Sequence, residues 1–170
     1  MKTERKTVYK GTVIANYFIE LGAEYGSPLT PMAANKLTSI AHGFFMALTG
    51  APLIGEPVEA WQYGPVVRTV YELLRPHGRS PIYSCSFQDE LECNQFQALK
   101  LDTDALHVIH GVWLGYGTMS GYQLSEISHE PGTPWHQVWH EQGGKERRNT
   151  VIPDGLIRDY YADQLQAEDN

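Results

Sequence analysis

The segment from Thr30 to Gly50 constrains the fold most, because it carries a complete set of signals for one long helix. Thr30 before Pro31 is typical of a helix start: the threonine accepts a hydrogen bond from a free backbone N–H, and proline removes a donor that has no partner there. Apolar residues then recur every three or four positions as far as Gly50, a residue typical of a helix end. The segment therefore predicts a long helix that packs through an apolar face.

The same spacing predicts helices on both sides of this one. They cover residues 13–25, 67–75, 102–116, 120–128, 133–140 and, at the C-terminus, 150–166. Residues 57–62 alternate apolar and polar side chains before Tyr63-Gly64-Pro65, which indicates a short strand and a turn, and 81–87 leave room for a second strand. The prediction is mainly α: a single compact domain over 1–170, with six or seven helices, a small β element, and flexible ends at 1–10 and 167–170.

Length and composition agree with one folded domain of 170 residues, since 42% of the residues are hydrophobic and 19% are charged. No apolar run reaches the roughly 18 to 20 residues that span a bilayer, so no membrane partner is expected. The first residues lack the apolar block of a secretory signal, which favours the cytoplasm. Cys85 and Cys93 fit no redox or zinc motif and are expected to be free thiols.

The charge distribution bears on the partner. Four basic residues and one acidic residue lie in the first ten positions, which leaves nine basic and nineteen acidic residues in 11–170. Because an acidic body repels phosphate backbones, nucleic acid is an improbable partner, and a nucleic-acid regulator remains only a third alternative. The charge favours a protein or a small cationic partner.

Three histidines suggest a different chemistry. His136 and His140 stand one helical turn apart, as in a metal-binding HExxH motif, and His129 lies nearby in sequence as a possible third ligand. Gln137 replaces the glutamate that would take a proton from metal-bound water. A metal-dependent hydrolase encoded by a phage or mobile element is therefore the alternative function, and surface or capping histidines are the simpler interpretation.

A histidine on the long helix and three aromatic residues near turns each have a structural and a functional interpretation. His42 on the long helix fits a buried hydrogen-bonding histidine, and Gly43 beside it suggests that another helix approaches closely. Trp61, Tyr63 and Trp135 lie near predicted turns or helix starts, where an aromatic side chain is often partly covered. Protein interfaces select such residues, but a place in the core is equally compatible with the pattern.

Several strings together resemble one known family. They are Lys-Leu at 36–37, Ala-His-Gly-Phe-Phe at 41–45, Ala-Leu-Thr-Gly-Ala-Pro-Leu at 47–53, Glu-Ala-Trp-Gln-Tyr-Gly-Pro-Val-Val at 59–67, Val-Tyr at 70–71, Leu-Ser-Glu-Ile-Ser-His at 124–129 and Thr-Pro-Trp at 133–135. In this order, over roughly 12–140, they resemble the SocA-like or Panacea antitoxin domain, also known from phage-associated proteins of the GepA type. Thr38 and Ser39 depart from the bulky apolar pair that is usual after Lys-Leu.

The resemblance implies a mainly helical, non-enzymatic domain without a cofactor that binds and neutralises a cognate toxin protein. Family members can act as chaperones, or as adaptors that deliver the toxin to a cellular protease. The motif residues that become candidates for partner binding are His42, Trp61, Tyr63, Tyr71, His129 and Trp135. The resemblance specifies neither the toxin nor an oligomeric state.

Overall fold

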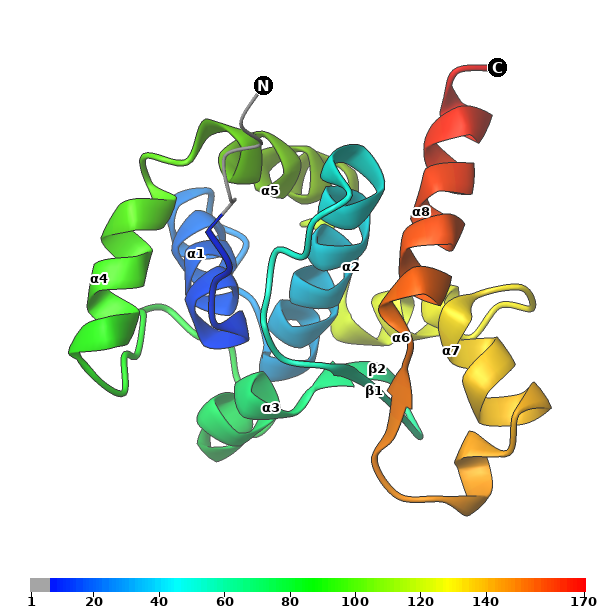
Figure 1. The fold of residues 1–170 in the computed structure, drawn as a ribbon. Coiled ribbons are helices and arrows are strands. Elements are labelled where there is room, and N and C mark those ends of the chain that lie inside the picture. Colours follow the sequence, from blue (N-terminus) through cyan, green and yellow to red (C-terminus); the bar gives the residue numbers. More distant parts are fainter. Residues whose placement is uncertain (1–6) are drawn as a thin grey trace.

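A computed structural model describes residues 7–170 and confirms the mainly helical fold (Figure 1). Its α-helices are α1 (Gly11–Glu24), α2 (Pro31–Thr49), α3 (Arg68–Leu74), α4 (Glu90–Leu99), α5 (Thr103–Tyr116), α6 (Gly121–Ser128), α7 (Pro134–His136) and α8 (Asp154–Glu168). Short 3-10 helices, η1 (Arg75–His77) and η3 (Gly144–Glu146), and a π-helical turn, η2 (Gln137–Glu141), complete the helical structure. No helix within 7–170 is both long and apolar enough to cross a membrane.

The long predicted helix, α2, is the centre of the domain and packs against α1, α5, α6 and α8 (Figure 1). Its predicted ends are confirmed: the Thr30 side chain accepts from the Ala33 N–H, and Gly50 adopts a left-handed φ of 73°. Side chains also cap three later helices: those of Asp102, Ser120 and Thr133 each accept a backbone N–H at the helix start. α4 was not predicted, because it buries only three of its side chains and so shows no clear apolar stripe.

The sheet is larger than the predicted β element. β1 (Val58–Trp61) lies between β2 (Gly64–Val67) and β3 (Thr150–Ile152), and both neighbours run antiparallel to it. The helix predicted from residue 150 begins only at Asp154, because the β-branched residues at 150–152 pair with β1 and Pro153 separates the two elements. The possible strand at 81–87 is wrong: only Ile82 forms a bridge, with Leu29.

Parts of the two ends expected to be flexible are ordered. Residues 1–6 lie outside the described residues, but 7–10 are held in place. Tyr9 is buried, its N–H donates to the Leu53 carbonyl at 2.9 Å, and its hydroxyl donates to Asp102 at 2.7 Å. At the other end, α8 continues through residue 168.

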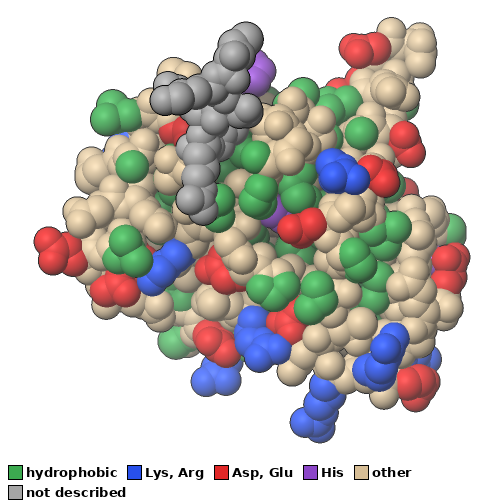
Figure 2. Space-filling model, viewed as in Figure 1, with side chains coloured by type: hydrophobic (Ala, Val, Ile, Leu, Met, Phe, Trp, Pro, Cys, Tyr) green, Lys and Arg blue, Asp and Glu red, His purple; other side chains and the backbone are tan. Residues whose placement is uncertain are grey.

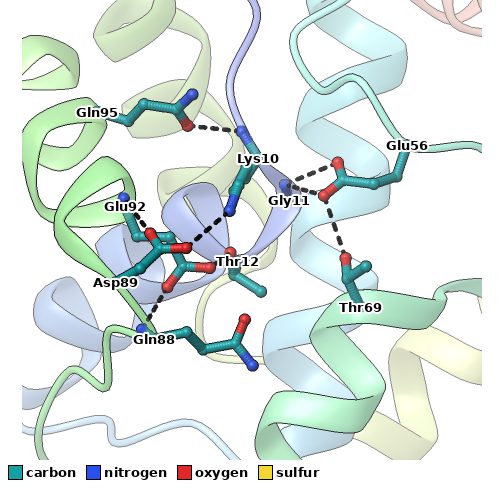
Figure 3. A network of polar contacts seen from close by, with 9 residues as sticks. All are labelled: Lys10, Gly11, Thr12, Glu56, Thr69, Gln88, Asp89, Glu92 and Gln95. Carbon is teal, nitrogen blue, oxygen red and sulfur yellow. Dashed lines mark hydrogen bonds and ion pairs between the residues drawn. The ribbon is translucent and has the colours of Figure 1, made fainter.

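The start of α1 depends on a carboxylate from another part of the chain. No side chain of its own segment caps this helix. Glu56, in the segment that leads to β1, instead accepts the Gly11 N–H at 2.9 and 3.1 Å and the Thr69 hydroxyl at 3.2 Å (Figure 3). An anionic group is favourable at the positive end of a helix. Glu56 therefore fixes the approach to β1 against α1 and α3.

A second carboxylate ties α4 to α1 beside the first (Figure 3). Glu92 is buried, and it accepts hydrogen bonds from the Thr12 hydroxyl and the Gln88 N–H, both at 2.7 Å. Asp89 caps α4 and pairs with the Lys10 ammonium at 3.3 Å. Its pKa lies below the ordinary value, chiefly because the Glu92 N–H donates to the Asp89 carboxylate. These contacts hold a helix that has little apolar surface of its own.

Gly43 confirms the predicted close approach of another helix. A Cβ placed on Gly43 would overlap the ring of Tyr161, which α8 packs directly against α2. The Phe44 ring also contacts Tyr161, with ring centres 4.6 Å apart. Glycine is required here because the aromatic ring occupies the space of its side chain.

We expect Gly43→Ala to lower the free energy of unfolding by about 1–3 kcal/mol, the usual cost of inserting atoms into a packed core. Gly111→Ala is the matched control, because a Cβ on this helical glycine of α5 meets nothing within 4 Å. Alanine favours helix by up to about 1 kcal/mol over glycine, so the control should be neutral or stabilised. Urea denaturation followed by circular dichroism measures both, and equal effects would contradict the packing argument.

Candidate partner-binding site

Side chains from three helices hold the β1–β2 hairpin. The carbonyl oxygens of four alternate hairpin residues each accept a hydrogen bond from a helical side chain: Trp61 O from Trp135 Nε1 (2.6 Å), Tyr63 O from Ser125 Oγ (2.8 Å), Pro65 O from Lys36 Nζ (3.1 Å) and Val67 O from Asn35 Nδ2 (3.0 Å). We call these four donors the hairpin clamp. Since buried carbonyls need partners, the clamp fixes the hairpin on α2, α6 and α7.

Asn35 takes the place of a neighbouring strand. β2 is an edge strand, and its Val67 would otherwise have a buried N–H and C=O without partners. The Asn35 side chain donates to the Val67 carbonyl and accepts the Val67 N–H at 2.9 Å. One amide side chain thus satisfies both groups, as a strand would.

Gly64 explains the Tyr-Gly-Pro motif. It has a φ of 112°, in the region that favours glycine. A Cβ there would lie 2.6 Å from Ser128 Oγ and 3.0 Å from Lys36 Nζ. The turn therefore needs glycine both for its backbone conformation and for its close contact with the helices beneath.

Lys36 is an unusual component of the clamp, because its ammonium is buried. The residue is 3% exposed, and within 7–170 Nζ has one hydrogen bond, to the Pro65 carbonyl. Burial lowers the pKa of Lys36 to about 7, since the charged form is poorly solvated. His129 also has a lowered pKa, mainly through burial and secondly through the nearby Lys36.

His42 is a buried structural residue rather than a surface contact. Its Nδ1 accepts the backbone N–H groups of Leu53 and Ile54 at 3.3 and 3.4 Å, which leaves Nε2 to donate to Asp154 at 3.2 Å. This hydrogen bond lowers the pKa of Asp154. His42 joins α2 to the segment after it and to the start of α8, so it has no surface to offer a partner.

The candidate metal ligands do not form a metal site. His129 stacks on the Trp135 ring with centres 4.0 Å apart, whereas the His140 ring meets the edge of Trp135 at 5.5 Å. His136 contacts His140, and its Nδ1 lies 3.8 Å from Glu141. Within residues 7–170, no three His, Cys, Asp or Glu side chains are grouped as metal ligands. The three histidines of the alternative function thus lie around the Trp135 ring, and within 7–170 they are not grouped as metal ligands.

Trp61, Tyr63 and Tyr71 do come together, in a groove of about 540 Å³ that we call the aromatic groove. Trp61 meets Tyr71 edge to face with ring centres 4.9 Å apart. Tyr63 is 61% and Tyr71 41% exposed, while Trp135 is only 3% exposed beneath the hairpin. The other lining residues are Pro31, Met32, Asn35, Lys36, Gln62, Val66, Arg75, Gly78 and Arg79.

Sequence reasoning missed Met32, Arg75 and Arg79 in this groove. Met32 was assigned only to the start of α2, and the arginines lie on η1 and in the irregular segment after it. No local pattern indicates that these segments meet the hairpin. Asn35 was also missed, although a polar residue next to Lys36 within a largely apolar helix is a signal that could have identified it.

Comparison with known proteins identifies the family to which the sequence motifs at 36–135 belong. The family model for the Antitoxin SocA-like, Panacea domain matches residues 35–136. The chain belongs to this family. It is also 29% identical over 150 residues to Antitoxin SocA of Caulobacter vibrioides (strain NA1000 / CB15N), an alignment that covers 87% of this chain and 80% of that protein. No solved structure matches the chain.

The residues matched to the Panacea domain contain the whole hairpin clamp. The match begins at Asn35 and ends one residue beyond Trp135, so the first and last clamp donors lie at its two limits. Within it, Lys36, Gly64 and Ser125 hold the turn. Much of the motif therefore maintains the hairpin, whose aromatic side chains line the groove.

Asn35→Ala should lower the free energy of unfolding by about 2–4 kcal/mol, because it leaves both a buried N–H and a buried carbonyl of Val67 unsatisfied. Asn94→Ala is the control, since Asn94 is exposed on α4, and its effect should stay within about 0.5 kcal/mol. Chemical denaturation of both variants checks this. A small loss in Asn35→Ala would show that the clamp contributes little.

The buried ammonium predicts a pH dependence of stability. With a folded pKa of about 7 against an ordinary 10.5, Lys36 binds fewer protons in the folded than in the unfolded state between these values. The free energy of unfolding should therefore rise with pH above 7, by at most about 1.4 kcal/mol per pH unit from this group.

Lys36→Met should remove this rise, and Lys145→Met, which lacks only a surface ammonium, should retain it. The measurement is urea denaturation of all three proteins at pH 7, 8 and 9. If the wild type and Lys36→Met show parallel pH profiles, the buried lysine does not titrate in this range.

Proposed function

We propose that this protein is an antitoxin that neutralises a cognate toxin by direct protein–protein binding through the aromatic groove, acting in the cytoplasm and catalysing no reaction. The single observation that carries the proposal is the groove itself: it exposes Tyr63, in the turn of a hairpin that belongs to the family motif, and Tyr71, on α3. Membership of the Panacea antitoxin family supports the antitoxin role.

The chemistry of the groove suits a protein partner. Tryptophan and tyrosine dominate the binding energy of many interfaces, because they desolvate a large area while losing few rotatable bonds. The clamp holds Trp61 and Tyr63 in place before a partner arrives, which reduces the conformational entropy lost on binding. Binding in the groove is the common first step whether the toxin is shielded, chaperoned or delivered to a cellular protease.

Replacement of the exposed aromatic side chains tests the proposal. Tyr63→Ala and Tyr71→Ala should each weaken toxin binding at least about tenfold, the loss expected for an interface anchor. The product of the neighbouring gene is the probe: we would co-express it, score growth, and measure the affinity of the purified pair. Circular dichroism should show wild-type folding, because both side chains are solvent-exposed.

Tyr83→Ala and Tyr122→Ala are the matched controls, since these tyrosines are 69% and 71% exposed and do not line the groove. Both should bind and rescue growth like the wild type. Full rescue by folded Tyr63→Ala and Tyr71→Ala would place the interface elsewhere. A neighbouring product that is neither toxic nor bound by the wild-type protein would contradict the antitoxin proposal itself.

A further inference from the structure

We infer that the aromatic groove recognises an acidic segment of the partner protein, one in which carboxylates flank an aromatic or apolar side chain. This inference rests on the proposed toxin-binding function and specifies its partner chemistry. Net charge favours a protein or a small cationic partner, and the inference specifies a protein with a local negative charge.

Charge is distributed unevenly around the groove. Of the nine basic residues in 11–170, six lie in 68–79 and 145–148, and on the face in Figure 2 most Lys and Arg side chains gather along the lower part. The groove is lined by Arg75, Arg79 and the buried Lys36, and none of its lining residues is Asp or Glu. A positively charged groove in an acidic protein attracts an anionic ligand locally.

The cations in the groove have few internal partners. Within residues 7–170, the guanidinium groups of Arg75 and Arg79 make no ion pair and no side-chain hydrogen bond. Arg68 differs, because its guanidinium donates two hydrogen bonds, from Nε and Nη2, to the buried Glu59 carboxylate. Each free guanidinium offers five N–H donors in a planar fork that matches a carboxylate.

Two buried groups add to this excess of donors. Lys36 is among the residues that line the groove and has a single carbonyl acceptor. The Trp61 indole N–H is enclosed and has no acceptor within 7–170. The N-terminal turn of α2, with Pro31 and Met32, also lines the groove and adds the positive end of a helix dipole. The donors that line the groove therefore favour a ligand that supplies acceptors and negative charge.

The aromatic and apolar side chains that line the groove indicate the uncharged part of the ligand. Trp61, Tyr63 and Tyr71, together with Met32 and Val66, give the groove apolar surface between its charged ends. A bare phosphate would leave this surface uncovered, whereas an apolar or aromatic side chain would bury it and place neighbouring carboxylates near Arg75 and Arg79. A protein segment with both features fits the groove better than a nucleic acid, which the acidic body repels.

Charge reversal in the groove is the first test, with the purified full chain and the neighbouring-gene product as partner. Arg75→Glu combined with Arg79→Glu should weaken binding at least about tenfold, and the two Arg→Lys replacements should retain most of it. Arg147→Glu with Arg148→Glu is the matched control, because it reverses the same charge outside the groove. The control should bind like the wild type, and unchanged binding by the groove variant would overturn the inference.

A second test does not depend on the toxin. Wild-type protein is used to select peptides from a random 12-residue phage-displayed library at 150 mM salt, in parallel with Arg75→Glu/Arg79→Glu. The inference expects Asp or Glu next to aromatic or apolar residues among wild-type binders, and loss of this enrichment in the variant.

Enrichment of Lys and Arg, or no charge preference, would overturn the inference, as would salt-sensitive binding of single-stranded RNA in the groove. If acidic peptides are selected but the neighbouring product is not bound, the groove chemistry stands and the proposed function fails. If the product is bound and the groove variant binds it equally, the function stands and this inference fails.

Discussion

The structure depends on hydrogen bonds from helical side chains to the carbonyl oxygens of one short hairpin. A two-stranded ribbon is marginally stable alone, and here its outer edge faces α2 instead of another strand. Asn35 and Lys36 satisfy that edge, while Ser125 and Trp135 satisfy the turn and the end of β1. Because these donors come from helices that pack on one another, the hairpin can move only if the helical core moves as well.

Sequence reasoning succeeded where a signal is local. The cap at Thr30 and the close approach at Gly43 follow from residues whose backbone chemistry has few alternatives. β3 was missed because its pairing with β1 joins segments far apart in the chain. β2 follows β1 directly, but a four-residue strand carries too little periodic signal alone. His42 was offered both as a buried residue and as a contact, and only the spatial neighbours Leu53, Ile54 and Asp154 decide between them.

The candidate site also contains some residues that a local sequence signal identifies and others that only the fold identifies. Tyr63 was identified as an aromatic residue near a predicted turn, and Tyr71 through the family resemblance, and neither argument needs the fold. Arg75 and Arg79 could not be identified in this way, because nothing in an isolated arginine indicates which other segment it faces. Net charge lacks this detail for the same reason: it sums the nineteen acidic and nine basic residues of 11–170 and does not reveal a groove whose charged lining residues are Lys36, Arg75 and Arg79.

The residues that hold the hairpin differ from the exposed residues that line the groove. Its donors act on backbone carbonyls, so they place no demand on the side chains at 62 and 63 or on those of α3 and η1. Met32, Gln62 and Arg79 are exposed, line the groove and take no part in the clamp. Substitution at such positions changes the charge and shape of the groove at little cost in stability, since exposed side chains contribute about 0.5 kcal/mol or less. The interactions that hold the hairpin are therefore separate from the exposed side chains that give the groove its charge and shape.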